Sequence, residues 1–248
     1  MKKNDRLASC RAFTLIELLT VIAVIGVLAA ILIPVIGNVR DRAKLTQSVS
    51  QSRSLALGLI GLSNEKGMFP YGYNSESGRS WDDLLAAADG WNTNSIDWRE
   101  LNSQSFGLHA PLDEVERGFG PPERRTDSRY WRSYSMVRNR VGGEVLGPAG
   151  YFQNDNFKSD QTRLSNLEDA AGTLLLAERF DPSNMAFNNS GAVIDSPAQQ
   201  SAGDAFTLDG MYVYAFCDGH VERLKPEDTI GEGTMTRPLG MWSYEMND

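Results

Sequence analysis

The apolar residues of this chain are concentrated close to its beginning. From Phe13 to Ile36 the sequence is almost entirely apolar, and Glu17 is the only charged residue. A helix rises about 1.5 Å per residue, so a run of this length can cross a hydrocarbon core about 30 Å thick. No stretch after residue 65 approaches it. The pattern predicts one membrane-spanning helix and a soluble remainder.

The helical pattern continues past Pro34 with more polar residues between the apolar ones. A proline inside a helix removes one hydrogen bond and bends the helix, and in a bilayer a neighbouring helix can cover that defect. The polar stretch 46–54 weakens the apolar stripe, and Gly67 and Pro70 end it. We expect one helix over 14–64 whose second half presents an apolar face to a globular head. The apolar positions are Val35, Ile36, Val39, Ala43, Leu55, Leu59 and Leu62.

The remaining residues are rich in Gly, Asn, Ser, Asp and aromatic side chains, with short apolar runs. The segment SWDDLLAAA (80–88) predicts a short helix capped by Ser80 or Asp82. The segment TLLLAER (173–179) predicts a buried strand. Residues 89–128 predict mostly loop.

The best local signal in the head is GMYVYAFCDGHVERL (210–224). Residues 211–217 alternate and Asp218-Gly219 is a tight-turn pair, which together predict a β-hairpin. Cys217 is expected to be a small buried hydrophobic residue within it. The polar segment 181–205 predicts a long loop.

The charge of the chain bears on nucleic-acid binding. It has 24 basic and 32 acidic residues, a net charge of −8. Residues 121–140 nevertheless mix arginines with aromatic residues, a combination that can hold single-stranded nucleic acid. An acidic chain repels a polyanion, so the sequence favours a strand whose arginines pair with acidic neighbours in the same or the next subunit. The residues are Arg124, Arg125, Arg129, Tyr130, Trp131, Arg132, Tyr134, Arg138 and Arg140.

The head carries none of the common catalytic motifs of phosphate-binding loops, zinc proteases or serine hydrolases. Cys217 and His220 have the spacing of two zinc ligands, but no second pair accompanies them. Calcium prefers several oxygen ligands, and Asp204, Asp209 and Asp218 lie near the predicted strand ends. These three residues are a candidate calcium site, although Asp-Gly pairs chiefly form turns.

The N-terminal segment AFTLIELL (12–19) follows a short basic leader and resembles the cleavage and methylation motif of type IV prepilins and type II secretion pseudopilins. The resemblance implies that prepilin peptidase cuts between Ala12 and Phe13, and that Phe13 is then N-methylated. The family usually has glycine where this chain has Ala12. Glu17 and Pro34 fall where the family places its glutamate and, in many members, a proline.

An ionised carboxylate inside a bilayer costs several kcal/mol unless it is paired. The cut would create a positive amine on Phe13, one helical turn from Glu17. The resemblance implies that Glu17 pairs with the amine of a neighbouring subunit and so sets the register of assembly. Basic residues flank both ends of the apolar run almost evenly. The expected topology, a single pass through the inner membrane with a periplasmic head, therefore rests on the motif.

Three segments of the head resemble recurring segments of a large prepilin-like group found in Planctomycetes. They are RSYSMVRN (132–139), TLLLAER (173–179) and FCDGHVE (216–222). That group often has a histidine nine residues before an Asp-Gly pair, and here the corresponding position is Leu208. A cysteine-proline segment of the group is replaced by HAPLD (109–113).

We therefore expect an α+β, pilin-like fold with a long N-terminal transmembrane and amphipathic helix packed on a small antiparallel β-sheet head. The resemblance implies a structural subunit of a type IV pilus or type II secretion pseudopilus rather than an enzyme. Its partners would be prepilin peptidase, identical or related pilin subunits and an inner-membrane assembly platform. The expected parts are a leader (1–12), a transmembrane and assembly helix (13–36), its amphipathic continuation (37–66) and a periplasmic or extracellular head (67–248).

The alternative is a membrane-anchored binding or catalytic domain that uses residues 14–36 as a plain signal anchor. An ordinary cleaved signal would be cut after small residues such as Val27-Leu28-Ala29, but the apolar run continues past that point.

Overall fold

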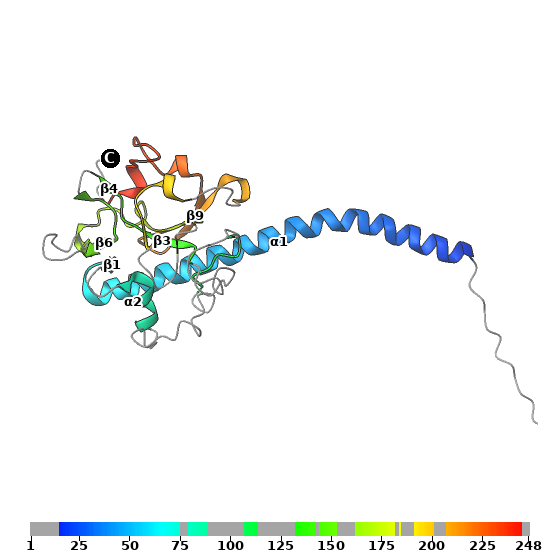
Figure 1. The fold of residues 1–248 in the computed structure, drawn as a ribbon, viewed down its shortest axis with the longest axis horizontal. Helices are drawn as coiled ribbons and strands as arrows, with labels where there is room; N and C mark the ends of the chain where they lie inside the picture. Colours follow the sequence, from blue (N-terminus) through cyan, green and yellow to red (C-terminus); the bar gives the residue numbers. More distant parts are fainter. Residues whose placement is uncertain are drawn as a thin grey trace, which may run out of the picture. The chain divides into compact units, whose positions relative to one another are not determined.

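The computed structural model describes residues 15–74, 79–88, 107–113, 132–141, 144–152, 162–181, 184, 191–200 and 207–244. The chain forms two compact units, Met1–Ala43 and Lys44–Asp248. Their elements are labelled in Figure 1. The long helix α1 (Leu15–Lys66) begins in the first unit and ends in the second.

Helix α1 confirms the helix expected over 14–64, and it runs through Pro34 without a break. It ends where the sequence predicts, because Gly67 has a φ of +69°. This left-handed conformation is typical of the residue that follows a helix, and glycine adopts it without a steric penalty.

The part of α1 in the second unit buries one face, and two of its six buried residues belong to the predicted apolar stripe. Leu55 and Leu59 are buried as expected. Three serines share the face with them, and they include two from the polar stretch 46–54. Small side chains allow a helix to approach a sheet closely, which is why the polar stretch does not interrupt the packing. The buried residues are Ser48, Ser52, Leu55, Ala56, Leu59 and Ser63.

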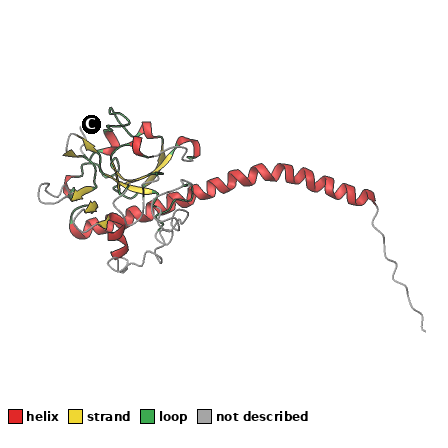
Figure 2. Cartoon of the chain, in the orientation of Figure 1, coloured by secondary structure: helices red, strands yellow, loops and turns green. Residues whose placement is uncertain are grey.

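The centre of the head is a five-stranded sheet in the order β10-β9-β7-β3-β8, whose strands are yellow in Figure 2. Neighbouring strands are antiparallel except β3 and β8, which are parallel. The expected antiparallel sheet is therefore present, with one parallel pair of strands at its edge. The strands are β3 (Tyr134–Val137), β7 (Leu174–Glu178), β8 (Val193–Ile194), β9 (Tyr212–Phe216) and β10 (Val221–Leu224).

Strand β8 also corrects the prediction that 181–205 is only a loop. The amide of Met136 donates to the carbonyl of Ala192, and that of Arg138 donates to the carbonyl of Ile194. A strand of two residues is too short to give a periodic pattern in the sequence, so β8 is recognised as a strand only by its pairing with β3. Residues 182–183, 185–190 and 201–206 of this segment lie outside the described residues.

The hairpin and the buried strand predicted in the head are both present. Strand β7 is buried along its whole length. Strands β9 and β10 pair across the turn at Asp218-Gly219, and Gly219 has a φ of +91°. All residues of β9 are buried, because this strand lies inside the sheet and is covered on both faces. Cys217 is buried, as expected.

Helix α2 (Trp81–Ala88) confirms the predicted short helix, and Ser80 precedes it as expected. The carboxylate of Asp83 accepts a hydrogen bond of 2.8 Å from the Ser80 amide, as in one half of a capping box. The Ser80 hydroxyl donates to Asp82 and Asp83. The cap thus depends on two carboxylates that the helix itself supplies.

Two smaller sheets and five short 3₁₀ helices complete the described part of the head. One sheet has the order β2-β1-β6 and the other joins β4 to β5. Residues 107–113 contain no helix or strand, while 89–106 and 114–128 of the predicted loop lie outside the described residues. The strands are β1 (Tyr71–Asn74), β2 (Arg79–Ser80), β4 (Arg140–Val141), β5 (Glu144–Val145) and β6 (Gly150–Phe152). The 3₁₀ helices are η3 (Leu164–Asn166), η4 (Pro197–Gln199), η5 (Leu208–Gly210), η6 (Pro226–Asp228) and η7 (Gly240–Trp242).

A long apolar N-terminal helix and a β-sheet head of mixed, mainly antiparallel strands together make an α+β, pilin-like fold.

Candidate functional site

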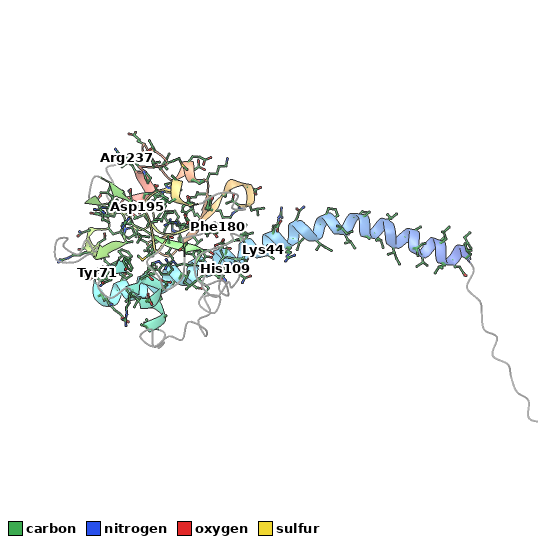
Figure 3. All side chains as sticks on the ribbon, viewed as in Figure 1. Lys44, Tyr71, His109, Phe180, Asp195 and Arg237 are labelled. Atoms are coloured by element: carbon green, nitrogen blue, oxygen red, sulfur yellow. The ribbon has the colours of Figure 1, made fainter. Side chains whose placement is uncertain are left out.

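The first unit exposes a continuous apolar helix surface. The large apolar side chains of α1 from Leu15 to Val39 are each at least half exposed, and Figure 3 shows them as sticks along the helix. In the described part of the chain, α1 is the one helix long and apolar enough to cross a membrane, with a mean hydropathy of 3.0 in its most apolar window. Soluble monomers rarely expose apolar patches larger than a few hundred Å². This surface therefore fits lipid or other apolar helices.

Glu17 lies in the first turn of this helix and is exposed. A carboxylate in the first turn is favoured by the positive end of the helix dipole. The hydroxyl of Thr20 donates a hydrogen bond of 3.0 Å to the carbonyl oxygen of Glu17. Ala12 and Phe13, the residues of the predicted cleavage site, lie outside the described residues.

Pro34 is the one proline within α1 and is also exposed. Because proline has no amide proton, the carbonyl of Ala30 lacks its usual donor four residues later. The charged residues Arg40, Asp41 and Arg42 follow Val39, the last large apolar residue of the first unit. They mark the end of the stretch that fits a hydrocarbon environment.

The structure does not bring together the two described residues of the candidate calcium site. Asp209 precedes β9 and Asp218 follows it. A strand rises about 3.3 Å per residue, so the two ends of the five-residue strand β9 are separated by roughly 13 Å. Asp204 lies outside the described residues. Among the residues that are described, no group of three or more His, Cys, Asp or Glu side chains is positioned to hold a metal ion.

Asp218 instead has a local role in the hairpin turn. Its Oδ1 accepts hydrogen bonds from the amide of His220, at 2.9 Å, and from Nδ1 of the same residue, at 2.6 Å. Burial alone would raise the pKa of Asp218, but these hydrogen bonds outweigh it and lower the pKa. The His220 ring stacks on Phe216 with a centroid distance of 4.1 Å. Cys217 and His220 thus form part of a turn, and burial raises the pKa of the Cys217 thiol.

Two of the described arginines of the 121–140 segment, Arg132 and Arg138, pair with acidic residues, as the sequence suggested. Arg132 forms a fully buried ion pair with Asp82. Arg138 binds Asp195 through two hydrogen bonds of 2.7 and 2.6 Å, and Asp195 is labelled in Figure 3. An arginine held by both oxygens of a carboxylate has its donors directed away from other anions. The first three arginines of the segment lie outside the described residues.

Sequence reasoning missed two buried acidic residues, Asp82 and Glu178, as partners in the core. Both are 1% exposed. A signal was present for Glu178, because it is the only charged residue in the apolar strand Leu174–Glu178. Charged residues are rarely buried unless they are paired or neutralised. A carboxylate in a buried strand is therefore a candidate for a buried ion pair or a raised pKa.

The comparisons with known proteins bear on the N-terminus. The family model described as the prokaryotic N-terminal methylation motif matches residues 7–33. The match includes Ala12, Phe13 and Glu17, and the chain carries a prepilin-type N-terminal motif. No curated protein and no solved structure matches the chain. The motif and the apolar helix together point to type IV pilin-like and pseudopilin-like proteins in general, and they are compatible with membrane anchoring.

Proposed function

We propose that this chain is a structural subunit, pilin-like or pseudopilin-like, of a type IV pilus or a type II secretion pseudopilus. One observation carries the proposal: a methylation motif lies at the start of an α-helix whose apolar residues up to Val39 are exposed. A plain membrane anchor needs the apolar surface but has no use for a processing motif. A helix that must leave the bilayer and pack against others needs both.

Maturation begins with cleavage between Ala12 and Phe13 by prepilin peptidase on the cytoplasmic face, followed by methylation of the Phe13 amine. Alanine is small, so the site fits a peptidase that usually accepts glycine before the cut. Until assembly, the subunit stays in the inner membrane through one span with its head in the periplasm. An inner-membrane assembly platform then moves it into the filament.

Glu17 gives the assembly its register. The amine created on Phe13 and the carboxylate of Glu17 are opposite charges that an apolar helix bundle cannot leave unpaired. When subunits pack with the correct stagger, the amine of one reaches Glu17 of its neighbour. A stagger error of one turn leaves both charges without a partner in a low-dielectric environment, which makes that arrangement unfavourable. Glu17 at this position also favours a body subunit over a priming one.

The first test is the mass of the mature N-terminus, measured on protein isolated from its native membrane. A methylated Phe13 is the expected result. An intact Met1 would instead support the plain anchor, and a chain beginning near Ala30 would identify an ordinary cleaved signal. Either of the last two results overturns the proposal.

The second test is the substitution Glu17→Ala, with Glu65→Ala in the same helix as its matched control. Glu65 is exposed in the second unit, so its loss should change nothing. We expect Glu17→Ala to insert into the membrane at the normal level and to be depleted from sheared filaments at least tenfold. Equal amounts of both variants in filaments would contradict the role of Glu17.

A further inference from the structure

Four side chains form a row across the central sheet. Arg223 on β10 is opposite Val213 on β9, and Tyr134 on β3 is opposite Glu178 on β7. The amide of Val213 donates a hydrogen bond of 2.8 Å to Oε2 of Glu178, which joins the two pairs. Residues directly opposite each other in antiparallel strands project to the same face of the sheet. The row therefore lies on one face.

This face is the one that packs against the second half of α1. The hydroxyl of Tyr134 donates a hydrogen bond of 3.2 Å to the carbonyl oxygen of Ser48. Beyond the C-terminal end of β9, a Cβ on Gly219 would lie 3.0 Å from Cδ2 of Leu57, so α1 also packs near the hairpin turn. Because Glu178 is directly opposite Tyr134, its side chain projects from the same face of the sheet, which is the face on which α1 packs.

On this face Glu178 has fewer hydrogen-bond donors than a buried carboxylate anion needs. It is 1% exposed, and among the described residues its Oε1 has no hydrogen-bond partner. Burial raises the pKa of Glu178 to about 8, although the Val213 amide opposes the shift. A buried carboxylate usually needs several donors, whereas a protonated carboxyl needs fewer. The geometry suits the neutral form.

The charged and titratable groups around Glu178 do not supply the missing partner. Tyr134 on β3, Tyr214 on β9, Asp113 in the 107–113 segment and Arg223 on β10 each interact with it. Asp113 raises the pKa of Glu178 further, and Arg223, which lowers it, has a smaller effect than burial. The Nη2 of Arg223 donates to the carbonyl of Leu208, and its buried Nε has no acceptor among the described residues. The buried face of α1 contributes no charge.

We propose that Glu178 is a proton-controlled latch for the docking of α1 on the sheet. With a neutral carboxyl, the segment Lys44–Lys66 packs closely over the row. When the carboxyl loses its proton, the charge is stable only if water reaches it, and water reaches it when this part of α1 separates from the sheet. The latch belongs to the second unit and does not depend on filament assembly.

The direction of the pH effect follows from linkage. The pKa of Glu178 in the docked state lies at about 8, above its ordinary value of 4.5. Between these values the docked state holds a proton that the open state has released. Docking therefore weakens as the pH rises through this window, by about tenfold in the docking equilibrium for each pH unit.

Hydrogen exchange of the full chain in detergent micelles tests this inference. After correction for intrinsic rates, protection of the amides from Ser48 to Leu59 should fall about tenfold per unit between pH of about 5 and 8. The substitution Glu178→Gln should remove this slope. Glu222→Gln is the matched control, because Glu222 lies on β10 and is exposed. It should keep the slope of the wild type.

A wild type without the slope, or the same slope in Glu178→Gln, would overturn the inference. If Glu178→Gln does not fold, the wild type still decides the question through ¹³C NMR of the Glu178 carboxyl. A titration midpoint near pH 8 agrees with the latch. A midpoint near 4.5 means that Glu178 is ionised in the docked state and rules the latch out.

Discussion

The guanidinium of Arg132 donates a hydrogen bond of 2.7 Å from Nη1 to Oδ1 of Asp82, and both side chains are completely excluded from solvent. Its Nε donates to Oδ1 of Asn184 at 2.9 Å, and its carbon Cζ lies 5.6 Å from the centre of the Trp81 ring. Burial lowers the pKa of Arg132, and Asp82 opposes this shift. The pair joins the first turn of α2 to the residues that lead into β3.

Replacing Arg132 with methionine should destabilise the head by about 3–5 kcal/mol, because Asp82 would remain buried without its counter-ion. The double variant Arg132→Met with Asp82→Asn should regain part of this loss. Urea unfolding of the wild type, both single variants and the double variant gives the interaction free energy. A single-variant loss below about 1 kcal/mol would show that water reaches the site.

Asp83 should make the head less stable as the pH rises from about 4 to about 6. Burial, and then the adjacent charge of Asp82, raise the pKa of Asp83 to about 6 from an ordinary value of 3.8. In this window the folded state holds a proton that the unfolded state has released, so the free energy of unfolding decreases with rising pH.

Asp83→Asn tests this effect, because asparagine keeps an oxygen that can accept from the Ser80 amide. The variant should be more stable than the wild type at pH 7 by about 1–3 kcal/mol and nearly equal at pH 4. The exposed residue Asp228 provides the control substitution Asp228→Asn. A stability difference for Asp83→Asn that is the same at both pH values would contradict the assignment.

Leu59 and Arg53 distinguish the two sides of α1 within the second unit. Leu59 is 0% exposed, whereas Arg53 is exposed. Leu59→Ala should cost about 2–5 kcal/mol, since it removes buried methyl groups and leaves a cavity. Arg53→Ala should change stability by less than about 0.5 kcal/mol. Thermal unfolding in detergent measures both, and equal losses would mean that α1 is rotated relative to the packing seen in the structure.

Two glycines should respond to alanine in opposite directions. Gly240 has a φ of +58°, and a Cβ there would lie 2.9 Å from the Cα of Gly231. Gly240→Ala should therefore cost about 1–3 kcal/mol. Gly61 lies inside α1 with open space around it, so Gly61→Ala should stabilise the helix by about 0.5–1 kcal/mol. Denaturant midpoints of the two variants, compared with the wild type, give the sign in each case.

The elements predicted correctly are those with a strong local pattern. The helix up to Lys66, the strand Leu174–Glu178 and the turn at Asp218-Gly219 each follow from periodicity or from a turn pair. The strand β8 and the burial of Ser48 and Ser52 could not be predicted, because they depend on partners far away in the sequence. The same holds for the ion pair of Arg132 with Asp82, whose residues are 50 positions apart.

The sequence by itself determined the N-terminal part of this protein. An apolar run, one carboxylate at Glu17 and a methylation motif define the membrane-compatible helix, because hydrophobicity and helical periodicity are local properties. Only the tertiary structure decided the environment of the acidic residues in the head. Whether Glu178 or Asp83 is solvated, paired or held neutral depends first on burial, which distant parts of the chain create, and the pKa of each carboxyl follows that environment.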